Sequence, residues 1–231
     1  DLIWVGHAEP WKRHGSGLIE ITALPQVSLV PLDLSNERSV TELAGEIGGK
    51  VDIVINTAEV HRTFGIQARR GTDAAKAEMD INYFGCLRVT MGLLPGMVAK
   101  RKGHVVNISS IGVLTNAPRF SAYVASKSAL DAFSRCAAAE FSDQNVRFTT
   151  INMPLVRTPM IAPTKMYDYA PAIQPEEAAD MICDAMIRRP KRIATRLGIF
   201  AQILYDLAPQ TTEIIMNTGF KMLPEPDAAK G

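Results

Sequence analysis

The sequence predicts an α/β fold, a doubly wound parallel sheet, because two kinds of segment alternate along its 231 residues. Short apolar runs rich in β-branched residues predict buried strands, and the longer segments between them have the apolar periodicity of helices. Strands that alternate with helices form βαβ units with parallel strands and right-handed crossovers. The predicted strands are residues 2–5, 27–32, 51–55, 105–108 and 146–151, and the predicted helices are residues 37–47, 74–99, 122–141 and 175–188.

The composition and charge exclude several classes of protein. A formal net charge of +1 gives no overall attraction to nucleic acid, which we therefore do not expect as a partner. Cys86, Cys136 and Cys183 lie far apart without the spacing of metal ligands, which predicts free thiols in a reducing compartment and no metal site. The sequence shows no secretory signal and no apolar run long enough to cross a bilayer. We therefore expect a cytoplasmic protein.

A single domain is expected over residues 1–231, since the length suits one core and no repeat or flexible linker divides the sequence. Residues 1–190 carry the alternating pattern, and residues 191–231 form an apolar C-terminal extension. Such an extension fits a helix packed on the same core, a helical hairpin that closes a pocket, a dimer face, or a surface that enters a membrane interface. The expected partners are accordingly a second copy of the chain, in a homo-oligomer, and a membrane contacted peripherally through this segment.

The strongest chemical signal is a tyrosine and a lysine four residues apart, Tyr123 and Lys127, in a predicted helix. This spacing places both side chains on one helical face, one turn from each other. A free phenol has a pKa of about 10, which is too high for efficient proton transfer at neutral pH. A neighbouring ammonium favours the phenolate and lowers that pKa. The pair therefore predicts an acid–base group.

Two further polar residues support this interpretation. Ser110 follows the predicted strand 105–108 and precedes Tyr123 by thirteen residues, so it lies at the carboxyl edge of the sheet, where open α/β sheets bind ligands. Asn82 places an amide inside an otherwise apolar helix, which is mildly unfavourable for the helix. We expect that amide to bind water or a backbone carbonyl.

In order and spacing, Asn82, Ser110, Tyr123 and Lys127 resemble the Asn-Ser-Tyr-Lys tetrad of the short-chain dehydrogenase/reductase family. Residues 51–56 and 105–110 resemble the fourth and fifth strands of that family, and residues 154–160 resemble its segment after the sixth strand. The resemblance extends over residues 2–190. It implies a Rossmann-like fold and an enzyme that transfers a hydride between a nicotinamide cofactor and a carbonyl or alcohol carbon.

The resemblance also implies a role for each residue of the tetrad. Tyr123 would be the general acid in reduction and the base in oxidation. Lys127 would lower the pKa of Tyr123 and hold the ribose hydroxyls of the nicotinamide nucleotide. Ser110 would donate a hydrogen bond to the substrate oxygen as negative charge develops on it. Asn82 would hold the water chain that resupplies protons.

The cofactor site follows from the same resemblance. Asp33 matches the acidic residue that holds the adenine ring, and residues 154–158 match the segment that contacts the nicotinamide. If residues 2–5 form the second strand of the family, His7, Lys12 and Arg13 lie near the adenosine ribose, where cations favour a 2′-phosphate. We therefore expect NADP(H) ahead of NAD(H). The implied cofactor contacts are Asp33, Leu34, Asn56, Ala58, Tyr123, Lys127, Pro154, Val156 and Thr158.

The sequence departs from the family pattern in three places. The glycine-rich turn that receives the pyrophosphate is absent, so residues 2–5 are interpreted as the second strand, with the first strand, glycine turn and first helix missing. Those elements either belong to a longer protein or have been lost. The family turn Asn-Asn-Ala-Gly reads Asn56-Thr57-Ala58-Glu59, and Glu59 adds bulk and negative charge beside the cofactor. Leu155 replaces the glycine that usually follows Pro154.

Residues 108–123, 153–164 and 192–198 resemble one branch in particular, the reductase domain of fatty acyl-CoA reductases and of bacterial multidomain proteins with such a domain at the C-terminus. That branch implies NADPH-dependent reduction of a long-chain acyl thioester or a fatty aldehyde. The apolar extension would suit an acyl channel, as it would suit other hydrophobic substrates. The missing glycine turn and Glu59 support a rival hypothesis, a non-catalytic domain with a scaffolding or dimerisation role.

Overall fold

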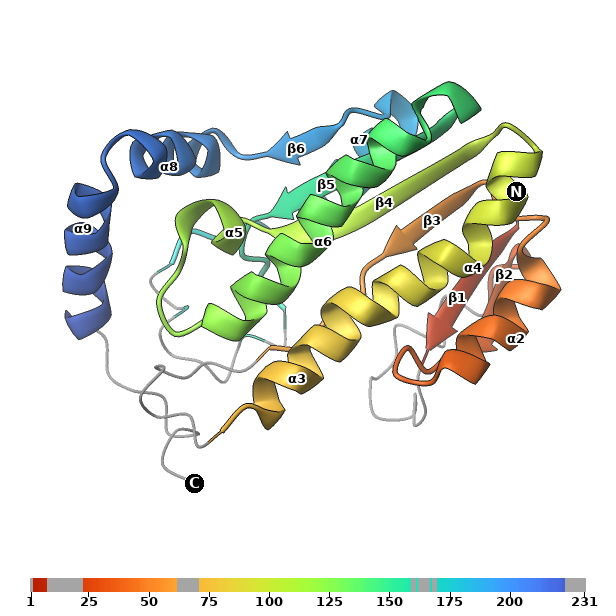
Figure 1. Cartoon of the computed structure of the whole chain (residues 1–231), viewed down its shortest axis with the longest axis horizontal. Coiled ribbons are helices and arrows are strands. Elements are labelled where there is room, and N and C mark those ends of the chain that lie inside the picture. Colours follow the sequence, from red (N-terminus) through yellow and green to blue (C-terminus); the bar gives the residue numbers. More distant parts are fainter. Residues whose placement is uncertain are drawn as a thin grey trace.

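Parallel strands form the centre of the fold, with helices packed on both faces (Figure 1). The computed structural model describes residues 2–7, 23–61, 71–158, 161, 167 and 170–222. The strands are β1 (Ile3–His7), β2 (Val27–Pro31), β3 (Ile53–Asn56), β4 (Gly103–Ser110), β5 (Val146–Met153) and β6 (Arg192–Ala194). The helical segments are α2 (Glu37–Ile47), α3 (Asp73–Met79), the π-helical turn η3 (Asp80–Gly85), α4 (Cys86–Ala99), α5 (Gly112–Thr115), α6 (Ser121–Glu140), the short 3₁₀ turn η4 (Ser142–Gln144), α7 (Pro175–Arg188), α8 (Arg196–Leu207) and α9 (Pro209–Met222).

The alternating pattern in the sequence predicted most of these elements. Helices α2 and α7 have the predicted bounds, and local signals explain their starts. The Asn36 side chain caps α2, whereas α7 has Pro175 in its first turn and a capping box between Gln174 and Glu177. The predicted helix 74–99 is instead interrupted by the π-helical turn η3, and β6 was not predicted.

The sheet is divided between β1 and β3. Among the described residues, β1 pairs only with β2, and β3, β4, β5 and β6 pair in that order, all of them parallel. The usual strand order of a doubly wound sheet is 3-2-1-4-5-6. If β1 is the second strand of that order, β2 is the third and β3 the fourth, and the division falls at the place of the first strand. The observed order therefore agrees with the interpretation of residues 2–5.

Two apolar cores lie on opposite faces of the four-stranded sheet, because successive side chains of a strand point to opposite faces. Val105 of β4 packs into the core that α2, α4 and α6 cover. Val106 and Ile108 pack into the core beneath α7, with Ile151 and Ala185. Helices therefore cover both faces, as the doubly wound prediction requires, and α4 and α6 lie together on one of them (Figure 1).

The carboxyl ends of the strands lie at one edge of the sheet. In the parallel register, Asn56 at the end of β3 is paired with Asn107, and Ser110 at the end of β4 is paired with Met153 at the end of β5. Helix α6 begins just beyond this edge and runs back across β4 and β5 (Figure 1). The segments that follow β3, β4 and β5 therefore lie at this edge, near the first turn of α6.

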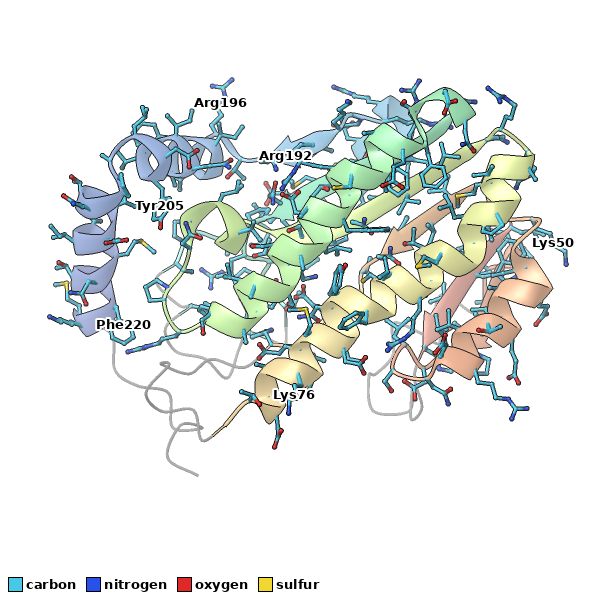
Figure 2. All side chains as sticks on the ribbon, in the orientation of Figure 1. Lys50, Lys76, Arg192, Arg196, Tyr205 and Phe220 are labelled. Atoms are coloured by element: carbon cyan, nitrogen blue, oxygen red, sulfur yellow. The ribbon has the colours of Figure 1, made fainter. Side chains whose placement is uncertain are left out.

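The apolar C-terminal extension forms α8 and α9 at the end of the molecule farthest from β2, where Arg196, Tyr205 and Phe220 lie (Figure 2). The backbone of α8 comes so close to α5 that a Cβ on Gly198 would lie 3.0 Å from Leu114 Cδ1. The Arg119 guanidinium lies 4.8 Å from the centre of the Phe220 ring and holds the end of α9. Within the described part of the chain, no helix has the length and apolar character needed to cross a bilayer.

Many apolar side chains of α8 and α9 remain exposed despite these contacts. Phe200 is 62% exposed and Leu207 is 80% exposed, so these helices do not bury a complete apolar face against the core. The exposed apolar residues of the two helices are Leu197, Ile199, Phe200, Ile203, Leu207, Ile214, Ile215 and Met222. The segment therefore packs on the domain through Gly198 and Phe220 and leaves many of its apolar side chains exposed.

The buried His104 makes the stability of the fold depend on pH. Its ring is fully buried in β4 with Nε2 2.9 Å from the Thr149 hydroxyl, and burial together with the positive charge of Arg189 lowers its pKa from 6.5 to about 4. The unfolded chain binds a proton near pH 6.5 and the folded chain does not, so stability is complete above that pH and is lost as the pH falls towards 4. At pH 5 the expected loss is about 2 kcal/mol.

The test is the free energy of unfolding in urea at pH 7.5 and pH 5.0 for the wild type and for His104→Gln. The variant lacks the titrating imidazole, so its free energy of unfolding should fall by about 2 kcal/mol less between the two pH values. Equal losses in the two proteins would show that His104 does not carry this pH dependence.

Candidate active site

Tyr123 and Lys127 lie in the first two turns of α6, at the carboxyl edge of the sheet. The Lys127 side chain is fully buried, and its Nζ donates a hydrogen bond to the Ile108 carbonyl oxygen at 2.8 Å. The same Nζ lies 5.9 Å from the centre of the Tyr123 ring, which is 9% exposed. The predicted face-sharing of the two residues is confirmed, and the ammonium is fixed against the end of β4.

Ser110 stands beside the phenol of Tyr123. It is the last residue of β4, as predicted, and its Oγ accepts a hydrogen bond from the Gly112 backbone at 3.1 Å. The Ser110 side chain lies close enough to the phenol to lower the pKa of Tyr123 in part. The two hydroxyls are therefore placed to contact one substrate oxygen.

Asn82 is fully buried in the π-helical turn η3, a feature that is common at functional sites. Its Oδ1 accepts from the Val60 amide at 2.8 Å, and its Nδ2 donates to the Val60 carbonyl at 2.7 Å and to the Ser126 hydroxyl at 3.0 Å. Both amide hydrogens thus bond to protein atoms, one of them to a backbone carbonyl, as expected. The side chain ties the segment after β3 to helix α6.

Glu59 is the residue that completes this cluster. Its Oε2 accepts a hydrogen bond from the Tyr123 hydroxyl at 3.2 Å and forms an ion pair with Lys127 Nζ at 3.0 Å. The Glu59 side chain is 27% exposed, whereas its lysine partner is fully buried. One carboxylate oxygen therefore bridges the two residues expected to carry out the chemistry.

The electrostatics of Tyr123 differ from the sequence-based expectation. Burial raises the pKa of the phenol well above its usual value of 10, and the negative charge of Glu59 raises it further. The neighbouring Ser110 side chain lowers it in part. The expected lowering of the pKa of Tyr123 by Lys127 is therefore wrong for this arrangement, because burial and the Glu59 carboxylate dominate.

Aromatic rings that sequence reasoning had not assigned to the site surround Tyr123. The His61 ring lies 5.7 Å from that of Tyr123, edge to face, and the Phe120 ring lies 6.4 Å from it. Tyr167 stacks on Phe120 at 6.2 Å. The position of His61 after β3, two residues beyond Glu59, is the sequence signal that could have placed it at this edge.

Asn56 uses its side chain to hold the sheet together. Its Nδ2 donates to Asn107 Oδ1 at 2.7 Å and to Thr90 Oγ1 at 3.2 Å, and Asn107 in turn donates to the Ser134 hydroxyl at 2.7 Å. These buried bonds connect β3, β4, α4 and α6. The predicted cofactor contact at Asn56 would therefore come from its backbone.

The other predicted cofactor residues follow the ends of β2, β3 and β5. Asp33 is exposed, and its Oδ1 accepts from the Ser35 backbone and hydroxyl at 2.9 and 2.7 Å, which lowers the pKa of the carboxyl. Arg88 donates to the Leu34 carbonyl at 2.8 Å and fixes that turn. Ala58 is exposed beside Glu59.

The segment that follows β5 pairs with a neighbouring segment of the chain at Ile173. Val156 forms a bridge with Ile173, and Pro154 and Thr158 are half-buried on either side of it. Leu155, which replaces the family glycine, accepts a backbone hydrogen bond from Ile173 at 2.8 Å. Of the residues expected near the adenosine ribose, His7 ends β1, whereas Lys12 and Arg13 lie outside the described residues.

These positions fit a nicotinamide nucleotide on one condition. A buried ammonium at Lys127, the Tyr123 phenol and the exposed turn at Ala58 lie along one edge, as the nicotinamide end of the nucleotide requires. That ammonium is ion-paired with the Glu59 carboxylate, so the condition is that a ribose hydroxyl competes with this pair for it. No cluster that could hold a metal ion is found among the described residues.

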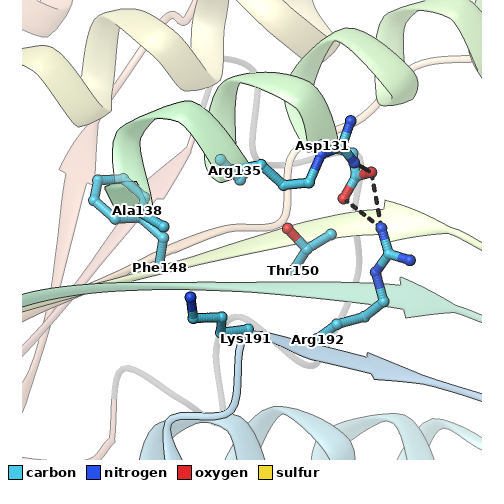
Figure 3. Close-up of a pocket in the computed structure, with 8 residues that line it drawn as sticks. Asp131, Arg135, Ala138, Phe148, Thr150, Lys191 and Arg192 are labelled. Atoms are coloured by element: carbon cyan, nitrogen blue, oxygen red, sulfur yellow. Dashed lines mark hydrogen bonds and ion pairs between the residues drawn. The ribbon is translucent and has the colours of Figure 1, made fainter. Parts of the chain in front are cut away.

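A pocket of about 370 Å³ lies apart from this cluster, between α6 and strands β5 and β6 (Figure 3). The Asp131 carboxylate is 6% exposed and accepts hydrogen bonds from Arg192 at 3.1 and 3.4 Å, and it also pairs with Arg135. The pocket is lined by Asp131, Ser134, Arg135, Ala138, Phe148, Thr150, Lys191 and Arg192. Asp131 lies two helical turns beyond Tyr123, about 12 Å along α6, so the pocket is distinct from the candidate active site.

The chain is similar in sequence to known members of one protein family. The family model described as short chain dehydrogenase matches residues 13–167. Over 215 residues the chain is 49% identical to a fatty acyl-CoA reductase of Acinetobacter baylyi, covering 89% of this chain and 71% of the relative. Over 207 residues it is 42% identical to an uncharacterized oxidoreductase of Mycobacterium tuberculosis, covering 87% of this chain and 60% of the relative.

A solved structure shows the same fold. A short chain dehydrogenase from Burkholderia cenocepacia, in complex with NADP, superposes with a TM-score of 0.79 at 22% sequence identity. The match covers 93% of this chain and 86% of that one. At this level of identity the likeness concerns the fold alone.

The buried amide of Asn82 should be important for stability. Asn82→Ala removes three hydrogen bonds and leaves the buried Ser126 hydroxyl and the Val60 backbone groups without that partner. The free energy of unfolding should fall by about 2–4 kcal/mol. Asn36→Ala at the exposed start of α2 is the control, with an expected loss of about 1 kcal/mol. Equal losses, measured by urea denaturation, would contradict this role of Asn82.

Proposed function

The chain belongs to the short-chain dehydrogenase family, and on that premise we propose that it reduces the carbonyl group of a fatty acyl-CoA or fatty aldehyde with NADP(H). Membership of the family makes it an oxidoreductase. The observation that supports catalysis is the cluster of Ser110, Tyr123 and Lys127 at the carboxyl edge of the sheet. The relatives named fatty acyl-CoA reductase support the substrate class.

In the proposed reduction, the bound nucleotide supplies the hydride. Lys127 holds the ribose hydroxyls of the nucleotide, because its ammonium is fixed by the Ile108 carbonyl at the end of β4. Tyr123 gives its phenolic proton to the substrate oxygen, and the Ser110 hydroxyl donates a hydrogen bond to the same oxygen as charge develops there. Burial and the Glu59 carboxylate raise the pKa of the phenol and make it a weaker acid, so proton donation requires Glu59 to move away from Tyr123.

The position of α8 supports a hydrophobic substrate. Helix α5 follows Ser110 directly, and α8 packs closely against it through Gly198. Helix α8 also carries partly exposed apolar side chains, including Ile199 and Ile203. An apolar wall beside the reacting group suits a long acyl chain.

Two observations favour NADP(H) over NAD(H). The strand expected to approach the adenosine ribose, β1, ends in His7 rather than in an acidic residue. The structural relative from Burkholderia cenocepacia was solved with NADP. Titration with both reduced nucleotides distinguishes the two cofactors directly.

The ion pair between Glu59 and Lys127 favours a second candidate function, a non-catalytic domain that keeps its tetrad but binds no nucleotide. The two functions predict opposite results in a single measurement. The enzyme binds NADPH or NADH, and the scaffold binds neither at millimolar concentration.

We expect Tyr123→Phe to abolish turnover and to preserve nucleotide binding, because the substitution removes only the hydroxyl. NADPH oxidation with a long-chain acyl-CoA and with a fatty aldehyde should fall by about 100-fold or more, while the dissociation constant for NADPH stays within about 3-fold. Tyr83→Phe is the matched control and should keep the wild-type rate. Unchanged turnover in Tyr123→Phe would overturn the assigned chemistry.

We further propose that α8 and α9 contact a second copy of the chain, since large exposed apolar patches on a soluble domain mark interaction surfaces. Phe200→Ser with Leu207→Ser should convert the oligomer to a smaller species in sedimentation velocity. Ile187→Ser, at a side chain 78% exposed on α7, is the control and should leave the assembly intact. If the double variant keeps its assembly but no longer floats with lipid vesicles, the surface is assigned to a peripheral membrane contact instead.

A further inference from the structure

We propose that Glu59 is an internal competitor of the cofactor: its carboxylate occupies Lys127 and Tyr123 in the nucleotide-free protein and must rotate away before the nicotinamide ribose can bind. We call the two contacts from Glu59 Oε2, to Lys127 Nζ and to the Tyr123 hydroxyl, the Glu59 latch. The inference rests on the proposed function, because it concerns the same nucleotide site. It identifies Glu59 as the residue that sets the affinity for the nucleotide.

The latch uses the groups that the cofactor and the substrate need. Lys127 Nζ already donates to the Ile108 carbonyl, and its contact with Glu59 uses a second of its three hydrogen atoms. The Tyr123 O–H points to the same carboxylate oxygen, so its proton is turned away from a substrate. Closure of the latch therefore opposes cofactor binding and proton donation together.

Charge explains why the latch closes. A fully buried ammonium is costly unless an anion pairs with it, and Glu59 is that anion here. Ribose hydroxyls are neutral and compensate the charge less well than a carboxylate does. The nucleotide must therefore displace a favourable ion pair, and its apparent affinity falls by the fraction of molecules with an open latch.

The surrounding structure allows the side chain to move and keeps the backbone in place. The next residue, Val60, is bonded through both its amide and its carbonyl to Asn82, so the main chain beside Glu59 is fixed. The Glu59 side chain is 27% exposed and can turn into solvent, whereas Lys127 is fully buried and cannot follow it. Opening therefore requires a change of side-chain rotamer and no movement of the loop.

The test compares two ligands that differ in the part that meets the latch. NADPH carries the nicotinamide ribose, and 2′,5′-ADP lacks it. In Glu59→Gln and Glu59→Gly, the dissociation constant for NADPH, measured by fluorescence titration, should fall by at least about 10-fold, because the competing ion pair is gone. The dissociation constant for 2′,5′-ADP should change by less than about 2-fold, and the exposed control Glu46→Gln should match the wild type for both ligands.

Thermal unfolding gives a readout that does not depend on activity. Without nucleotide, Glu59→Gln should melt below the wild type, because Lys127 loses its buried partner. Saturating NADPH should then raise the melting temperature of the variant by more than that of the wild type, because it binds the variant more tightly.

The outcomes separate the two proposals. NADPH affinity that is unchanged or weaker in both Glu59 variants, with the wild type still binding the nucleotide, overturns the latch and leaves the reductase standing. Equal tightening for NADPH and for 2′,5′-ADP also overturns it, because the effect would then not involve the nicotinamide ribose. Failure of every variant to bind either nicotinamide nucleotide overturns the proposed function together with the latch.

Discussion

The burial of one charge, the Lys127 ammonium, is the constraint on which the arrangement of this edge of the fold depends. A side chain with no exposed area carries its charge only if hydrogen-bond acceptors and an anion surround it. The Ile108 carbonyl at the end of β4 supplies the acceptor and Glu59 after β3 supplies the anion. Helix α6 and the ends of two strands are thereby held around a single atom.

Buried polar bonds extend this attachment along α6 and explain why the edge is rigid. Ser126, next to Lys127, accepts from Asn82 of the π-helical turn, and Ser134, about two turns further, accepts from Asn107 of β4. Such bonds inside an apolar core are costly to leave unmade, so they specify one position of the helix on the sheet. In this cluster, the Glu59 side chain is partly exposed to solvent, whereas Lys127 is fully buried.

The sequence was informative where the signal is local. Apolar periodicity and capping residues defined α2 and α7, and the four-residue spacing put Tyr123 and Lys127 on one face. It did not predict the π-helical turn at Asn82, whose side chain bonds to Val60 in a loop distant in sequence. The short strand β6 was missed because three residues carry too little periodicity. The sign of the pKa change at Tyr123 depends on burial and on where Glu59 points, which only the folded chain determines.

The division of the sheet and the Glu59 latch concern the same question, how this edge binds a nucleotide. In a doubly wound sheet the pyrophosphate lies at the end of the first strand, and β1 and β3 flank that place here. In the proposed nicotinamide half of the site, Lys127 and Tyr123 are fixed and Glu59 is paired to both. A carboxylate that neutralises the buried ammonium keeps this half folded and stable without a ligand. In the proposed latch, the stability of the ligand-free edge and its affinity for the nucleotide are opposed, because one ion pair contributes to both.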